Sequence, residues 1–119
     1  MRRNKNAQIL GHIIAYCDDV INAVGRFGGG KEKFVSDRIF RNACAMPLMQ
    51  IGELAKSLPD DVIGMDSAIP WKDVKGMRDY FAHEYHEMDM DIIWNTIEEI
   101  PSFKEQCLRL REQLQRAQS

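Results

Sequence analysis

Apolar residues recur at helical spacing in four stretches of the chain, and no stretch shows the alternation typical of a strand. The first stretch predicts an amphipathic helix from about residue 5 to 26, which Gly28-Gly29-Gly30 ends. His12 falls on the polar face of this helix. Its apolar positions are Ile9, Leu10, Ile13, Ile14, Cys17, Val20, Ile21 and Val24.

The second stretch starts near Ser36 or Asp37, either of which can cap a helix, and it contains Pro47. Proline removes one backbone hydrogen bond and crowds the preceding turn, so we expect a bend there rather than a break. Pro59-Asp60-Asp61 closes the helix and opens a loop with room for one short turn. The apolar positions are Phe34, Ile39, Phe40, Ala43, Cys44, Leu48, Ile51, Leu54, Ala55 and Leu58.

Two further helices follow. Pro70 suits the first turn of a helix that runs from Trp71 to about Tyr85. The last helix begins near Asp89 or Asp91, and Pro101 should kink it or split it in two. Its expected buried positions are Ile92, Ile93, Trp94, Ile97, Phe103, Leu108, Leu110 and Leu114. The whole pattern predicts an all-α antiparallel bundle of about four main helices.

Length and charge limit the number of domains and the ways in which the chain could bind nucleic acid. A chain of 119 residues with 45% hydrophobic and 29% charged residues is typical of one globular domain, spanning residues 1–119. The formal net charge is −2, so the chain has no global basic field to attract nucleic acid. Any contact with RNA or DNA must therefore use a local basic patch, which two subunits could assemble together.

The cysteines argue for a reducing compartment. Cys17, Cys44 and Cys107 are odd in number and widely spaced, which disfavours a disulfide framework or a structural zinc site. No run is long and apolar enough to span a bilayer, and the N-terminal segment lacks the pattern of a signal peptide. We expect a cytoplasmic protein.

A phosphate-binding loop is suggested by Gly25 to Lys31, which spell Gly-x-x-x-x-Gly-Lys. The next residue is Glu32, where the motif needs Ser or Thr, and the preceding segment is predicted to be a helix rather than a strand. We interpret this segment as a connection between two helices.

The most reactive set of side chains lies between residues 76 and 85, where Arg78, His83 and Tyr85 follow one another closely. At about 100° per residue, Arg78 lies at the edge of a core-facing side, whereas His83 lies roughly opposite the core. The core-facing positions are Val74, Met77, Phe81 and Met88. Gly76 also lies on the outer side, where a mid-helix glycine costs ~1 kcal/mol unless something must approach closely.

Ideal helical geometry separates Arg78 from His83 by about 140°, which is too wide for one compact site. Either the helix loosens near His83, or a second copy of the chain packs on this face. A twofold axis would bring two Arg-His pairs into one cleft and concentrate positive charge there, so we favour a homodimer.

Such a cleft could cleave RNA. His83 could remove a proton from a ribose 2′-hydroxyl or deliver one to the leaving oxygen, and Arg78 could stabilise the charge on the phosphate. Asp79, one turn before His83, could orient the imidazole and favour its charged form. This set requires no metal or cofactor, and the product would be a 2′,3′-cyclic phosphate.

The spacing of these residues alone is also compatible with roles other than catalysis. Charged residues on the outer side of a helix usually form a solvated face, and Tyr85 at a core edge usually packs. A divalent metal could bind His83, His86 and Asp79, although their spacing fits no strong signature.

Arg78 to Tyr85 resembles the Arg-x4-His-x-Tyr motif of HEPN-domain proteins, specifically HepT-type toxins. The resemblance covers most of the chain. It includes the lead-in from Ile69 to Arg78, the segment Asp91-Ile92-Ile93-Trp94 with the later Ile100-Pro101, and Ile51-Gly52-Glu53-Leu54-Ala55, which is similar to the family's Ile-Gly-Glu signature.

This resemblance implies a HEPN-like homodimeric, metal-independent endoribonuclease that acts as the toxin of a type VII-like toxin–antitoxin system. Arg78 and His83 would be the catalytic pair, and Asp79 matches the polar residue that often follows the arginine. The implied partner is a minimal nucleotidyltransferase antitoxin of the MntA type, which would adenylylate Tyr85. The added AMP would place bulk and negative charge where RNA phosphate should bind.

The alternative from a different class is a non-catalytic helical module that binds a nucleotide or RNA, or that only partners the nucleotidyltransferase. RNA binding at low salt without cleavage products would favour this alternative.

Overall fold

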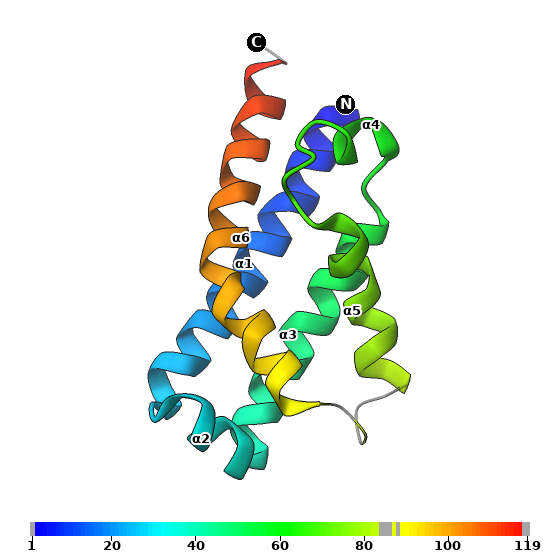
Figure 1. The fold of residues 1–119 in the computed structure, drawn as a ribbon. Coiled ribbons are helices and arrows are strands. Elements are labelled where there is room, and N and C mark those ends of the chain that lie inside the picture. The colour runs from blue at the N-terminus through cyan, green and yellow to red at the C-terminus, as the bar shows by residue number, and fades with distance from the viewer. Residues whose placement is uncertain (1, 84–86, 88, 118–119) are drawn as a thin grey trace.

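The structure of the chain is a computed structural model, which describes residues 2–83, 87 and 89–117, with side chains from residue 5 onward. The described residues form six α-helices and no strand (Figure 1). The predicted all-α class is therefore confirmed.

Four helices are long and two are short. The long helices are α1 (Arg2–Phe27), α3 (Arg38–Lys56), α5 (Trp71–His83) and α6 (Met90–Arg116), and the short ones are α2 (Gly30–Ser36) and α4 (Asp60–Ile63). The four long helices lie where the periodicity predicted the main helices. The prediction missed α2, which contains Phe34, a residue assigned from the sequence to the second main helix.

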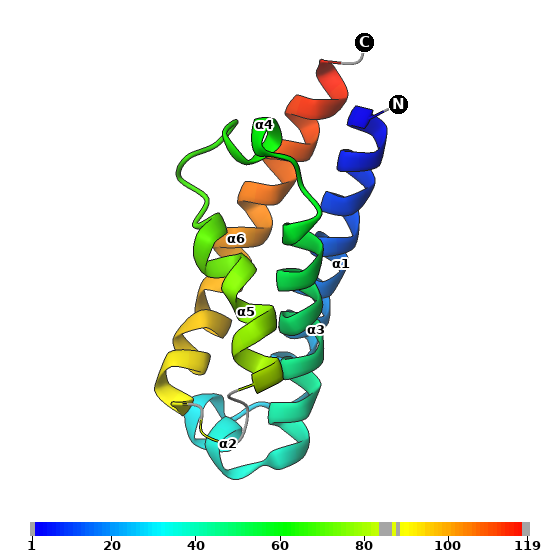
Figure 2. The ribbon, with the colours of Figure 1, turned by 90° about the vertical axis from the view of Figure 1, so that its right-hand side faces the viewer.

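The long helices are arranged around the core with antiparallel neighbours. α1 packs against both α3 and α6, and α3 packs on its other side against α5. Figures 1 and 2 show that the chain's two ends lie at the same end of the bundle, with α2 at the opposite end. The side between α5 and α6 is the least closely packed, and a groove lies there.

Consecutive glycines separate α1 from α2. Gly28, Gly29 and Gly30 have φ values of 63°, 74° and 62°, a left-handed region that other residues rarely adopt. The Gly28 amide donates to the Val24 carbonyl at 3.0 Å and ends α1. Because helices flank these glycines on both sides, the segment is the predicted connection and not the strand-to-helix turn of a phosphate-binding loop.

Aspartates start two of the long helices. The Asp37 carboxylate accepts from the amides of Ile39 at 2.9 Å and Phe40 at 3.3 Å, so it caps α3. Asp89 caps α6 by accepting from the Asp91 amide at 2.8 Å. These contacts confirm the predicted start sites and decide between the two candidate caps in each, Asp37 over Ser36 and Asp89 over Asp91.

Both internal prolines lie within uninterrupted helices. Pro47 lies inside α3, which continues through it as the sequence predicted. Pro101 also lies inside a continuous helix, α6, so the predicted possibility that this helix splits in two is wrong. Pro101 has no backbone N–H, so α6 lacks one intrahelical hydrogen bond there. The neighbouring Ile100 and Phe103 are buried and hold the parts of α6 on either side of Pro101 against the core.

Aromatic rings build the core near α2. The ring of Phe40 stacks on Phe27 at 4.8 Å between centroids, and it meets Phe34 and Trp94 edge-on at 5.2 and 6.2 Å. Phe40 has no exposed surface. These contacts join α1, α2, α3 and α6 at one end of the bundle, where each aromatic pair adds about 0.5–1.5 kcal/mol.

Two residues predicted to be buried are exposed. Ile39 is 69% exposed because the cap by Asp37 turns Phe40, its neighbour, into the core. Ile92 is 55% exposed because Ile93 and Trp94 occupy the inward positions of that turn. Hydrophobic residues next to each other in a helix point about 100° apart, so they cannot all share one buried face.

The three cysteines are free and buried. None of the helices in the described part of the chain combines the length and the apolar character that a bilayer span requires.

Candidate functional site

α5 carries the candidate residues and is anchored by its apolar face. Trp71 at its start is buried and meets Phe103 of α6 edge-on, with ring centroids 5.8 Å apart. Val74 and Phe81 are also buried, as the helical wheel predicted, and Met77 is partly buried. Met88, the fourth predicted position of this face, lies outside the described residues.

A glycine on α3 allows α5 to approach. A Cβ atom placed on Gly52 would lie 2.6 Å from the Arg78 amide nitrogen and 3.0 Å from the Val74 carbonyl oxygen. Real Cβ atoms do not come this close to backbone atoms, so the two helices can only adopt this spacing because residue 52 lacks a side chain. Gly52 therefore fixes where the backbone of Arg78 lies.

Four charged side chains form what we call the α3–α5 charge cluster: Glu53 and Lys56 from α3, and Arg78 and Asp79 from α5. The Nε atom of Arg78 lies 3.1 Å from Oε2 of Glu53. Its Nη1 atom lies 3.4 Å from Oδ1 of Asp79, and the same oxygen accepts from Nζ of Lys56 at 3.1 Å. Negative and positive side chains thus alternate across the two helices, in the order Glu53, Arg78, Asp79 and Lys56.

Lys56 and Arg78 keep Asp79 ionised. The hydrogen bond from Lys56 is the main cause that lowers the pKa of the Asp79 carboxyl below its usual value, and Arg78 adds to this shift. The side chains of the cluster remain partly open to solvent, with Arg78 at 41% exposure. The guanidinium is therefore positioned by its neighbours and yet accessible to an anion.

His83 is the last residue of α5 and is exposed. α5 is a continuous helix from Trp71 to His83, so the angular separation from Arg78 expected for a regular helix applies. No hydrogen bond or ion pair between described residues joins His83 to Asp79, whose carboxylate binds the two cations instead. That Asp79 orients the imidazole therefore stays a prediction. Tyr85 and His86 lie outside the described residues.

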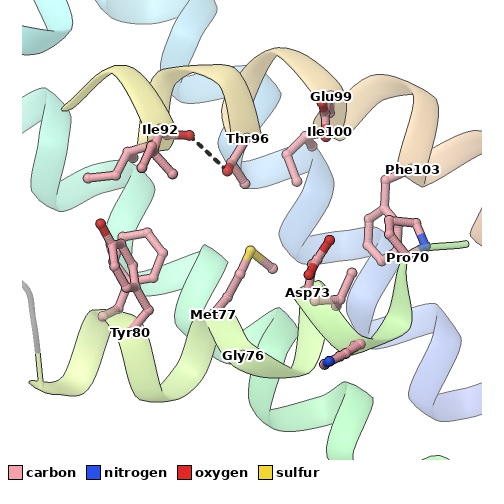
Figure 3. A pocket seen from close by; sticks show the side chains of 14 residues that line it. Pro70, Asp73, Gly76, Met77, Tyr80, Ile92, Thr96, Glu99, Ile100 and Phe103 are labelled. Atoms are coloured by element: carbon pink, nitrogen blue, oxygen red, sulfur yellow. Dashed lines mark hydrogen bonds between the residues drawn. The ribbon is translucent and has the colours of Figure 1, made fainter. Parts of the chain in front are cut away.

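A groove of about 510 Å³ lies between α5 and α6. Figure 3 shows Asp73, Met77 and Tyr80 pointing across it from α5 toward α6. Its walls are mostly apolar, with contributions from Met77, Phe81, Ile93, Ile100 and Phe103, and carboxylates from Asp73 and Glu99 also line it. Gly76 lines the groove as well, and a Cβ atom placed there would meet nothing within 4 Å.

A family comparison shows which family the chain belongs to. Residues 13–110 match the family described as "Ribonuclease HepT-like", which covers α3, α5 and most of α1 and α6. The chain belongs to the HepT-like ribonuclease family.

Individual HepT-like relatives agree with this assignment. The chain is 40% identical over 98 residues to "Putative RNase TTE0752" of Caldanaerobacter subterraneus subsp. tengcongensis, covering 82% of this chain and 86% of that protein. It is 32% identical over 104 residues to "Putative RNase MJ0125" of Methanocaldococcus jannaschii, covering 87% and 88%. It is also 35% identical over 82 residues to "Probable ribonuclease HepT" of Thermococcus cleftensis, covering 68% and 74%. No solved structure matches the chain.

The sequence reasoning missed two members of the charge cluster of this HepT-like chain. In the sequence, Glu53 stands out only as part of the Ile-Gly-Glu signature, and nothing in the local pattern marks Lys56. A possible signal was the helical register, because Glu53 and Lys56 are three residues apart and share one side of α3. The sequence alone could not show that this side faces Arg78.

The metal alternative is not tested by the described residues and stays a prediction. Among residues 2–83, 87 and 89–117, no group of three His, Cys, Asp or Glu side chains is arranged to hold a metal ion. His86, which the alternative requires, is not among these residues.

Proposed function

We propose that this HepT-like protein is a metal-independent endoribonuclease in which Arg78 and His83 act on the scissile phosphate. Membership of the HepT-like ribonuclease family carries the proposal, since this chain has both residues of the Arg-x4-His motif on one helix. The accessible guanidinium of Arg78 and the exposed imidazole of His83 are the chemical groups that the reaction needs.

In the proposed reaction the ribose 2′-oxygen attacks phosphorus, a P–O bond forms, and the bond to the 5′-oxygen breaks. His83 accepts the proton of the 2′-hydroxyl or donates one to the leaving 5′-oxygen, and one imidazole from each subunit could fill the two roles. Arg78 stabilises the negative charge that builds on the phosphate. The products are a 2′,3′-cyclic phosphate and a 5′-hydroxyl, and no metal takes part.

Two copies of the chain would complete this site. A regular α5 keeps Arg78 and His83 about 140° apart, so one protomer cannot easily direct both at one phosphate. The open space around Gly76, the groove beside it and the exposed Ile92 support close approach by a second α5. A twofold interface would then repeat each charged group across the axis.

We further propose that the protein is the toxin of a type VII-like toxin–antitoxin system in the cytoplasm. Its antitoxin would be a minimal nucleotidyltransferase of the MntA type that transfers AMP to Tyr85. This proposal rests on the motif resemblance, and it makes physical sense because an added AMP would repel RNA phosphate near Arg78. Incubation with the partner and ATP should add AMP mass to the wild-type protein and not to Tyr85→Phe.

The decisive test of the ribonuclease proposal is cleavage of RNA by the purified protein in EDTA. His83→Ala should abolish cleavage with an unchanged circular dichroism spectrum. His12→Ala is the matched control, because His12 is exposed on α1 and should be dispensable. Persistent cleavage by His83→Ala would contradict the assigned roles. RNA binding without cleavage by the wild type would favour the non-catalytic binding module.

A further inference from the structure

Two carboxylates contact the guanidinium of Arg78, at different atoms. Glu53 contacts Nε, the atom nearest the backbone, at 3.1 Å. Asp79 contacts Nη1 at the longer distance of 3.4 Å, and its oxygen is shared with Lys56 at 3.1 Å. The Glu53 contact thus leaves open the outer edge of the guanidinium, formed by Nη1 and Nη2, where an incoming anion would compete with Asp79 only for Nη1.

This arrangement suits recognition of a phosphate. A planar guanidinium binds an oxyanion best through two parallel N–H bonds, and a flexible arginine must lose rotational freedom to offer them. A carboxylate on Nε fixes the plane of the guanidinium before the phosphate arrives. Pre-positioning of this kind contributes to rate, because small misplacements of a catalytic group are costly.

The position of the Arg78 backbone is also determined by α3. Glu53 follows Gly52, the residue that allows the Arg78 backbone to approach α3. The two neighbours on α3 therefore place the backbone and the side chain of the same arginine. Lys56, one turn further along α3, draws Asp79 toward itself and limits competition for Nη1.

We propose that Glu53 is a positioning residue that holds Nε of Arg78 so that the outer edge of the guanidinium faces the RNA phosphate. This inference rests on the proposed ribonuclease function. Glu53 does not touch the substrate in this scheme, and it acts only through Arg78.

The test compares Glu53→Gln with the wild type in RNA cleavage under single-turnover conditions. Glu53→Gln keeps the shape of the side chain but removes its charge, and the rate should fall by on the order of 10-fold. Glu53→Asp should recover part of the loss if the shortened carboxylate still reaches Nε. Glu105→Gln is the control, since Glu105 is an exposed glutamate on α6 outside the charge cluster.

A double-mutant cycle separates positioning from general electrostatics. In an Arg78→Lys background the Nε atom is absent, so Glu53→Gln should cause little further loss. Equal losses in both backgrounds, or a faster Glu53→Gln enzyme, would overturn the positioning role while the ribonuclease proposal stands. A wild-type protein that does not cleave RNA would overturn the ribonuclease proposal and this inference with it.

Discussion

Gly52 of α3 and Arg78 of α5 are in direct backbone proximity: a Cβ atom on residue 52 would lie only 2.6 Å from the Arg78 amide nitrogen. The arginine that we assign to phosphate binding therefore lies where the two helices approach closely enough to exclude a side chain. The spacing of two helices and the position of a reactive group depend on the same glycine.

Gly52→Ala should destabilise the fold and reduce RNA cleavage. Forcing a methyl group into a packed interface typically costs about 1–3 kcal/mol, and the gain in helix propensity offsets about 1 kcal/mol of this. We expect a net loss of up to about 2 kcal/mol in the free energy of unfolding, measured by urea denaturation. Unchanged stability and unchanged cleavage would show that α3 and α5 can separate here without consequence.

Gly76→Ala is the matched substitution in α5, because a Cβ atom there meets nothing within 4 Å. The isolated protomer should become more stable by about 1 kcal/mol, as expected for a helix-interior glycine. If a second copy packs against Gly76, the same change should weaken dimerisation, which sedimentation velocity across a concentration series would detect. If the variant is more stable but its self-association is unchanged, Gly76 is not part of the dimer interface.

Phe40→Ala should cost about 3–5 kcal/mol in unfolding free energy, because it removes a ring with no exposed surface that contacts three other rings. Ile39→Ala, at the adjacent and 69% exposed position, should change stability by no more than about 0.5 kcal/mol. Thermal and chemical denaturation of the two variants would measure the difference. Similar losses at both positions would mean that Ile39 is covered in solution.

The buried thiols should be unreactive in the native protein. Burial raises the pKa of Cys17 and Cys44 from 9.0 to about 12, and it also raises the pKa of Cys107. At pH 8 iodoacetamide should therefore label the native chain slowly and the guanidinium-unfolded chain rapidly at all three cysteines, as mass spectrometry would show.

The same shifts predict how stability changes with pH. Each thiol has a higher pKa in the folded than in the unfolded state, so its contribution is complete below pH 9.0 and is lost as pH rises from there toward about 12. Cys17→Ala should reduce the loss of unfolding free energy measured between pH 8 and pH 10. Rapid labelling of native Cys17 at pH 8 would contradict this account.

The sequence determined the helical class and the approximate extent of the four long helices, because apolar spacing and capping residues are local signals. It also placed Arg78 and His83 on one helix, with Arg78 at its core edge and His83 on its outer side. These properties follow from residues that are close together in the chain.

Only the tertiary structure decided which side chains meet across helices. It paired Arg78 with Glu53, joined Asp79 to Lys56, and turned Ile39 and Ile92 outward against the predicted pattern. Helical periodicity defines a face but not the neighbour that covers it, and the spacing of α3 and α5 depends on one missing Cβ atom at Gly52.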